Sequence, residues 1–93
     1  MPFMYMLRCA DGTTYVGSTV DLERRLAQHC AGEGAEYTRG RLPVELIHFE
    51  EFSRIDDAFA REKQVQNWSR AKRLALAMGD FDALRPVSRK RWI

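Results

Sequence analysis

The chain has 93 residues, 45% of them hydrophobic and 11% aromatic, which suits one domain with one compact core. Its formal net charge is +2, and no stretch approaches the roughly 20 apolar residues of a membrane span. The N-terminal residues also lack the basic and apolar regions of a signal peptide, so we expect a soluble, cytoplasmic protein without a membrane partner. Cys9 and Cys30 lack the spacing of a zinc site, which favours free thiols.

The start of the chain predicts a hairpin of two strands. Residues 3–9 are largely apolar in both alternating sets, which indicates a strand covered on both faces and central in its sheet. An Asp-Gly turn at residues 11–12 leads into a second strand over residues 13–17, which Gly17 is expected to end.

The length of the hairpin loop decides which side chains share a face of the sheet. A two-residue loop places Tyr5 and Tyr15 on opposite faces, whereas a three-residue loop with a left-handed Gly12 places them together. The sequence permits either loop.

A helix is expected directly after this strand. Ser18 and Asp21 approximate a capping box, in which short side chains meet the free amides of the first turn. On a helical wheel, Arg25 and His29 share or border the apolar stripe that contains Leu22. A helix that only covers a core places such residues on its far side. A hydrogen-bonded core histidine beside an arginine with a buried stem explains the pattern equally well.

The rest of the chain predicts one strand and two further helices. Gly32 is the expected C-cap of the first helix, and a polar loop with two arginines and a tyrosine follows it. The expected elements are a strand over residues 44–52, a helix over residues 54–67 capped at Ser53, a helix over residues 70–78 between Ser69 and Gly79, and one possible further turn over residues 80–84.

Glu62 is the most informative residue of the second helix. It lies in the middle of the apolar stripe that includes Ile55 and Phe59. An unpaired buried carboxylate is costly, so Glu62 must be paired with a cation, bound to a metal or retained for chemistry. An ion pair with Arg25, or with a basic neighbour on its own helix, is the structural alternative.

The charges are unevenly distributed along the chain. Residues 1–60 contain 6 Lys and Arg against 10 Asp and Glu, whereas residues 61–93 contain 9 against 3. A basic surface beside an aromatic residue such as Trp92 suits a phosphate backbone. A solvated helix face followed by a tail has the same composition, so both interpretations stay open.

Two strand tyrosines and three inward-pointing polar residues together form a pattern that resembles the GIY-YIG nuclease superfamily, in particular its small single-domain, stand-alone members. The name motif reads Phe3-Met4-Tyr5 and Tyr15-Val16-Gly17, and the match continues through Arg25-x-x-x-His29 to Arg61-Glu62-Lys63. The resemblance implies an α/β (α+β) domain over residues 1–84, with a small central three-stranded sheet flanked by three main helices. Residues 85–93 would form a basic tail.

The resemblance also implies divalent-metal-dependent hydrolysis of DNA phosphodiesters. Glu62 would be the single protein ligand of Mg²⁺ or Mn²⁺, and no small-molecule cofactor is implied. Arg25 would neutralise charge on the scissile phosphate, and Tyr5 would be the general base. Tyr15 and His29 would position the water, the phosphate and Tyr5. Further DNA or RNA contacts are expected from Gly17, Arg24, Tyr37, Arg39, Arg41, Lys63, Arg70, Lys72 and Arg73.

Two departures from the family pattern limit how far the roles of the family's residues apply to this chain. Phe3-Met4 replaces the first Gly-Ile, and hydrophobic residues such as Leu74 stand where many catalytic members have an Asn after the metal-binding Glu. The leading hypothesis is a structure-selective endonuclease of DNA repair or processing. The alternatives are a non-catalytic nucleic-acid-binding module on a degenerate nuclease scaffold, and a protein-interaction domain that uses Trp68 and Trp92.

Overall fold

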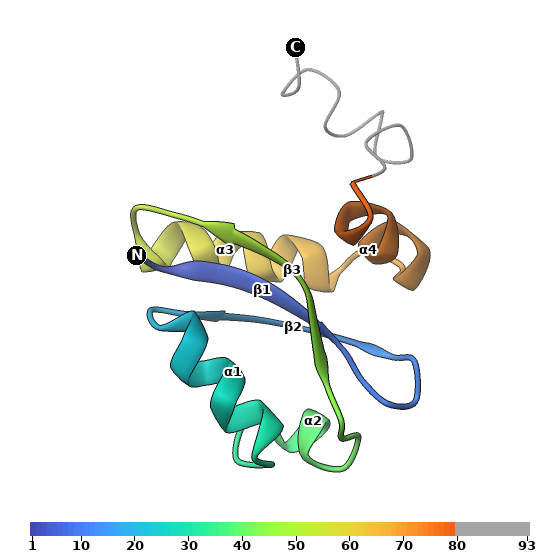
Figure 1. Cartoon of the computed structure of the whole chain (residues 1–93). Coiled ribbons are helices and arrows are strands. Elements are labelled where there is room, and N and C mark those ends of the chain that lie inside the picture. The colour runs from blue at the N-terminus through green and yellow to red at the C-terminus, as the bar shows by residue number, and fades with distance from the viewer. Residues whose placement is uncertain (80–93) are drawn as a thin grey trace.

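The computed structural model describes residues 1–79 and confirms the α+β class (Figure 1). The expected further turn over residues 80–84, the domain boundary at residue 84 and the basic tail lie outside the described residues. Within residues 1–79, no helix combines the length and apolar character needed to cross a membrane. The elements are β1 (Phe3–Arg8), β2 (Thr14–Thr19), α1 (Leu22–Cys30), α2 (Glu36–Arg39), β3 (Glu45–Glu51), α3 (Ile55–Gln66) and α4 (Arg70–Ala77).

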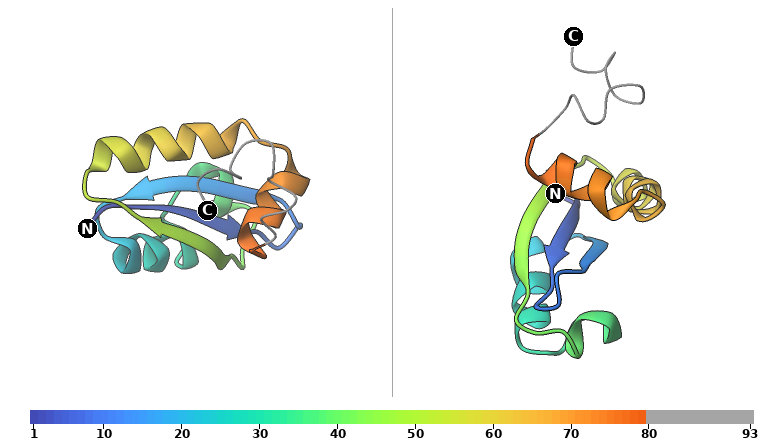
Figure 2. Two further views of the ribbon diagram at one scale, coloured as in Figure 1. Left: turned by 90° about the horizontal axis from the view of Figure 1, so that it is seen from above. Right: turned by 90° about the vertical axis from the view of Figure 1, so that its right-hand side faces the viewer.

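The three strands form an antiparallel sheet in the order β2-β1-β3, which confirms that β1 is central. Successive side chains of a strand point to opposite faces, and β1 is buried on both. On one face, Met4 and Met6 pack with Val65 of α3 and Leu76 of α4. Figure 2 shows the sheet lying between α3 and α1. The largest core is therefore on the α3 side, and the opposite face carries Tyr5.

The hairpin loop between β1 and β2 has three residues. The amide of Cys9 donates to the carbonyl of Thr13 at 2.8 Å, and Gly12 adopts a left-handed φ of 84°. The resulting register pairs Tyr5 with Gly17 and Leu7 with Tyr15. Of the two loops that the sequence allows, the structure has the one that places both tyrosines on the same face.

Strand β2 does not end at Gly17 as expected but continues to Thr19. A Cβ atom at position 17 would lie 2.6 Å from the Tyr5 hydroxyl oxygen, so the glycine makes room for that ring. The expected capping box is also wrong, because Ser18 is still in the strand. The N-cap of α1 is Asp21, whose side chain accepts from the Arg24 amide at 3.1 Å.

Helix α3 is rotated relative to the expected apolar stripe. Ile55 and Phe59 are 41% and 51% exposed, whereas Ala58, Glu62 and Val65 are buried. The expected cap at Ser53 is absent, because the N-cap is residue 54, which makes no side-chain capping bond. The buried side of α3 is thus the side that contacts β1 and β2, and it still contains Glu62.

The two other helices differ in how well the sequence predicted them. Helix α4 begins after Ser69, which accepts from the Lys72 amide, and ends before Gly79, which has a left-handed φ of 74°. Helix α2 is a single turn within the expected polar loop. Both cysteines are free.

Candidate active site

Three of the predicted site residues form one cluster on the α1 face of the sheet. The ring centroids of Tyr5 and Tyr15 are 6.3 Å apart, and that of His29 lies 5.7 Å from Tyr5 and 5.3 Å from Tyr15. Tyr5 and His29 are buried, whereas Tyr15 is partly exposed. Tyr15 is therefore the ring of this cluster that a ligand can reach first.

His29 is a buried histidine with hydrogen bonds at both ring nitrogens, as the interpretation of a hydrogen-bonded core histidine predicts. One of its partners is Tyr5. The Tyr5 hydroxyl oxygen lies 2.8 Å from Nε2, and Thr38 Oγ1 lies 2.8 Å from Nδ1. Burial, with a further contribution from Arg25, lowers the pKa of His29 from 6.5 to about 4. Burial also raises the pKa of Tyr5 to about 12, although Arg25 opposes this shift. At neutral pH the pair is an uncharged imidazole and a protonated phenol.

Arg25 supplies the positive charge of the cluster. The neighbouring Tyr5 hydroxyl, and more weakly Tyr15, raise the pKa of its guanidinium. Its Nη1 donates to Gln28 Oε1 at 3.1 Å, and within residues 1–79 no carboxylate forms an ion pair with it. The alternative in which Arg25 neutralises Glu62 is therefore wrong, and the cation remains available to an anion.

Glu62 is 9% exposed and has hydrogen-bond donors on both oxygens. Ser18 Oγ donates to Oε1 at 2.6 Å, and Gln66 Nε2 donates to Oε2 at 2.8 Å. Lys63 Nζ lies 3.7 Å from Oε2, but the Lys63 side chain is exposed, so this ion pair contributes little. Arg61 is paired with Glu50 instead. Hydrogen bonds from neutral donors thus offset most of the free-energy cost of burying the Glu62 carboxylate.

An open hollow of about 360 Å³ is lined by a residue that contacts Glu62 and by one that contacts the aromatic cluster. Ser18, which binds Glu62, and Arg25, which lies beside the tyrosines, both line it, together with Thr19, Asp21, Arg24 and Gln28. The negative charge of Glu62 also contributes to the raised pKa of Tyr5. The structure therefore brings five predicted residues into one region of the fold: Tyr5, Tyr15, Arg25, His29 and Glu62.

The oxygen atoms of Glu62 are suitable ligands for an ion such as Mg²⁺. Mg²⁺ prefers oxygen ligands, retains several waters and is often held by one or two carboxylates together with substrate phosphate. Glu62 is such a carboxylate, and each of its oxygens keeps a second lone pair beside the bond from Ser18 or Gln66. Residues 1–79 contain no group of three or more His, Cys, Asp or Glu that could hold a metal ion. A metal site among the described residues would therefore have fewer than three such ligands, as a site at Glu62 would.

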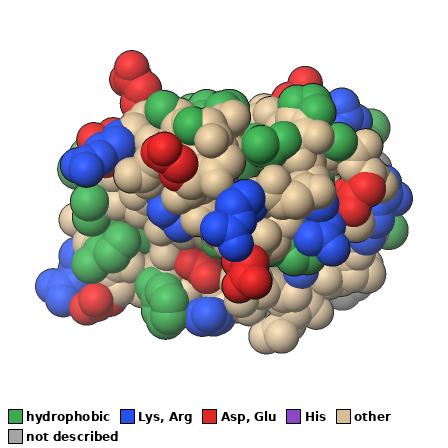
Figure 3. All heavy atoms as spheres, turned by 90° about the horizontal axis from the view of Figure 1, so that it is seen from below, with side chains coloured by type: hydrophobic (Ala, Val, Ile, Leu, Met, Phe, Trp, Pro, Cys, Tyr) green, Lys and Arg blue, Asp and Glu red, His purple; other side chains and the backbone are tan. Residues whose placement is uncertain are grey.

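Tyr37 and Arg41 extend the aromatic cluster toward solvent. Tyr37 is 39% exposed and stacks on Tyr15, with ring centroids 6.0 Å apart. The Arg41 guanidinium carbon lies 4.0 Å from the Tyr37 ring centroid, and its Nε donates to Asp11 at 3.0 Å. Among the other predicted contact residues, Arg24 and Arg39 are exposed. On the face that carries α1 and α2, basic and acidic side chains alternate (Figure 3).

Two of the predicted DNA contacts have structural roles. Gly17 is buried beneath the Tyr5 ring. Arg73 directs its guanidinium inward, donating to the carbonyls of Val65 and Gln66 and to Thr14 Oγ1 at 3.1, 2.6 and 2.9 Å. It fastens the end of α3 to β2, so the expectation that it contacts DNA needs correction.

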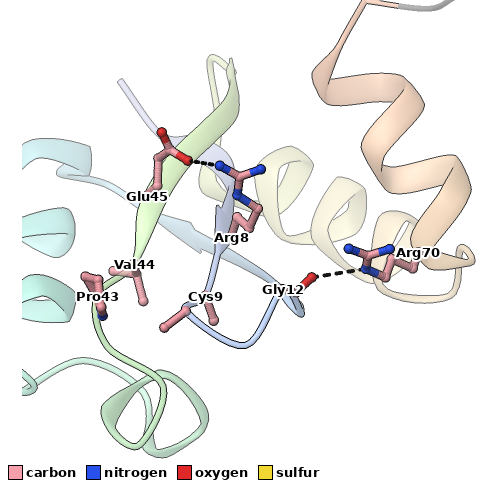
Figure 4. Close-up of a pocket in the computed structure, with 8 residues that line it drawn as sticks. Arg8, Cys9, Gly12, Pro43, Val44, Glu45 and Arg70 are labelled. Carbon is pink, nitrogen blue, oxygen red and sulfur yellow. Dashed lines mark hydrogen bonds and ion pairs between the residues drawn. The ribbon is translucent and has the colours of Figure 1, made fainter.

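Arg70 and Lys72 lie away from the aromatic cluster. Arg70 donates to the Gly12 carbonyl at 3.0 Å and lines a separate hollow near the hairpin loop, as Figure 4 shows. Lys72 lies over the Trp68 ring, with Nζ 4.4 Å from the centroid. Their basic charge is therefore not part of the site around Tyr5.

Sequence reasoning missed Ser18, Gln66 and Thr38 as parts of the site. Gln66 follows Glu62 by four residues, a spacing that places two helical side chains together and could have been recognised. Ser18 and Thr38 reach their partners only through tertiary folding, 44 and 9 residues away in sequence.

Most of the chain is similar to proteins of one known family. The family model described as the GIY-YIG catalytic domain matches residues 1–75. A UPF0213 protein of Natronomonas pharaonis is 54% identical over 76% of this chain and 84% of its own length. A UPF0213 protein of Haloquadratum walsbyi is 44% identical over 90% of this chain and 94% of its own length.

Solved structures show the same fold. The solution NMR structure of a UPF0213 protein from Bacillus halodurans is 36% identical, with a TM-score of 0.54, and the match covers 95% of this chain and 98% of that one. An NMR structure of a protein from E. faecalis has the same identity and TM-score and covers 85% of each chain. The family match and the solved structures together show that this is the fold of a GIY-YIG catalytic domain. The chain belongs to the UPF0213 family of small GIY-YIG proteins, which indicates a nuclease-like function with nucleic acid as its partner.

Proposed function

We propose that this protein is a divalent-metal-dependent endonuclease that hydrolyses DNA phosphodiester bonds in DNA repair or processing in the cytoplasm. One observation carries the proposal: Arg25 lies beside the hydroxyls of Tyr5 and Tyr15 and lines the same hollow as Ser18, which donates to Glu62. A cation, a candidate base and a hard oxygen ligand close to one another are what hydrolysis of a phosphodiester requires.

Each residue has a role in this mechanism. Arg25 binds the scissile phosphate and stabilises the negative charge that develops on it. Tyr5 takes a proton from the attacking water, and because its pKa is raised to about 12 it does so as a phenol that releases its own proton to His29. Tyr15 orients the phosphate at the exposed side. With Glu62 as its ligand, a Mg²⁺ or Mn²⁺ ion would supply charge neutralisation and polarise the water.

Substrate selection in this proposal depends on DNA structure and not on base sequence. The exposed edge of the Tyr37 ring, together with the Arg41 guanidinium that lies over the ring, suits contact with an unpaired base. The exposed basic side chains Arg24 and Arg39 suit phosphate oxygens, which carry no sequence information. Flapped, branched or single-stranded DNA presents both features.

The test is cleavage of labelled flapped, branched and single-stranded DNA with Mg²⁺, with Mn²⁺ and with EDTA. Tyr5→Phe and Glu62→Gln should each reduce cleavage by about 10²-fold or more, the size of a general-base contribution. Glu51→Gln removes an exposed carboxylate at the end of β3 and should cleave like the original chain. If activity survives both Tyr5→Phe and Glu62→Gln, the assigned roles are wrong.

A non-catalytic nucleic-acid-binding module is the second candidate. Many catalytic members of the family have an Asn after the metal-binding Glu. The single Asn of this chain, Asn67, is the exposed C-cap of α3, and the last turn of α4 has the hydrophobic residues Leu74 and Ala77 instead. If this second function is correct, the protein should bind DNA or RNA with an affinity that falls steeply with salt, and no substrate should show metal-dependent turnover. The cleavage assay therefore separates the two.

A further inference from the structure

Hydrogen bonds join Tyr5, His29, Thr38 and Ala35 in a chain in which each group donates to the next. Thr38 Oγ1 lies 3.0 Å from the carbonyl of Ala35, to which it donates, and 2.8 Å from His29 Nδ1. A threonine hydroxyl has one proton, and a carbonyl can only accept. Since that proton goes to Ala35, the Thr38 oxygen accepts from His29, and Nδ1 carries the ring proton. The lone pair of Nε2 then faces the Tyr5 hydroxyl at 2.8 Å, so Tyr5 donates.

We propose that Thr38 is a positioning residue that holds His29 as its Nδ1–H tautomer, so that Nε2 can accept the proton of Tyr5. The structural part of this proposal depends only on the hydrogen bonds. Its catalytic consequence rests on the proposed function.

The surroundings of His29 leave it little freedom to adopt another arrangement. His29 and Thr38 are both 0% exposed, so no bulk water can replace the bond between them. The imidazole packs against the backbone of Gly34, where any side chain would overlap the ring. The segment is closed by backbone bonds from Arg39 to Ala35 and from Arg41 to Thr38, at 3.0 and 2.9 Å. Thr38 is thus fixed by its own turn and not by His29 alone.

The tautomer decides whether Tyr5 can work as a base. As the water oxygen attacks phosphorus, its proton passes to the Tyr5 oxygen, and the original Tyr5 proton passes to His29 Nε2. The phosphorus–oxygen bond to the leaving sugar breaks, and the leaving oxygen takes a proton from solvent. His29 then returns its Nε2 proton to the Tyr5 oxygen, and Tyr5 releases the proton that it took from the water to solvent. In the other tautomer, a proton on Nε2 would point at Tyr5 and block this transfer. A phosphate bound by Arg25 offsets the charge that disfavours the imidazolium.

The experiment reads the tautomer directly from the ¹⁵N spectrum of the imidazole, with His48→Gln identifying the signals of His29. At neutral pH, the original chain and Thr38→Ser should show a protonated Nδ1 and an unprotonated Nε2. Thr38→Val, which keeps the shape but removes the hydroxyl, should shift the population toward protonated Nε2. In cleavage, Thr38→Val should lower kcat about 10- to 100-fold with little change in KM, while Thr38→Ser stays within a few-fold.

The proposal fails if the original chain has a protonated Nε2, or if the tautomer population of Thr38→Val is unchanged. Neither result requires turnover, so a chain with the expected tautomer and no cleavage refutes the proposed function and leaves the positioning role standing. Thermal unfolding checks that each variant folds. Thr38→Ala, which is smaller and also lacks the hydroxyl, replaces Thr38→Val if valine does not fit.

Discussion

Gly17 of β2 lies directly beneath the ring of Tyr5, and this close approach makes Gly17→Ala a sharp test of the site geometry. An added Cβ would lie 2.6 Å from the Tyr5 hydroxyl oxygen, 2.7 Å from Cζ and 3.1 Å from Tyr15 Cε2. Tyr5 is buried and hydrogen-bonded to His29, so its ring has no free space to enter. The substitution must therefore displace Tyr5 from His29 or push β2 away from β1.

The expected cost follows from these contacts. Overpacking a filled core costs about 1–3 kcal/mol, and loss of the bond between Tyr5 and His29 adds about 1 kcal/mol. Replacing a strand glycine by alanine recovers about 0.5–1 kcal/mol of backbone entropy. We expect Gly17→Ala to lower the free energy of unfolding by about 1–3.5 kcal/mol, which for a domain of this size lowers Tm by about 4–28 °C.

Urea and thermal unfolding measure this cost, with Gly40→Ala as the matched control because nothing lies within 4 Å of a Cβ at that position. In a Tyr5→Leu background, which removes the contacting atoms, the cost of Gly17→Ala should largely disappear. Equal stability of Gly17→Ala and Gly40→Ala, or the same cost in both backgrounds, would refute the reasoning.

Three further predictions address His29, Arg73 and Tyr37. His29 is protonated below pH 6.5 in the unfolded chain but only below about pH 4 in the folded chain. The free energy of unfolding should therefore fall as pH drops through this window, by at most about 3 kcal/mol. Urea unfolding of His29→Gln should lack this contribution to the pH dependence. Arg73→Met should cost about 2 kcal/mol in unfolding measurements, because it removes the inward hydrogen bonds to Val65, Gln66 and Thr14, while DNA affinity stays constant. Tyr37→Ala should weaken binding of single-stranded DNA about 10-fold by fluorescence anisotropy, and the exposed aromatic Phe49 gives the control Phe49→Ala, expected to have no effect.

The elements that the sequence predicted well depend on local chemistry. The apolar run of β1 and the boundaries of α4, with Ser69 before it and Gly79 after it, follow from side chains acting within a few residues. The one-turn helix α2 was missed, because its residues resemble a polar loop and its buried Thr38 finds its partner His29 only in the folded chain.

The sequence by itself determined the chemical inventory of this protein: two tyrosines on one hairpin, Arg25 and His29 one turn apart, and a carboxylate on the buried side of a helix. It could not decide whether the tyrosines share a face, because that depends on one residue in the loop. Only the tertiary structure shows that Gly17 makes room for Tyr5, that Ser18 and Gln66 hold Glu62, and that the hydrogen bonds of His29 have a direction. The reason is physical: close approach and hydrogen-bond direction are properties of atoms brought together across the sheet, and residue spacing does not encode them.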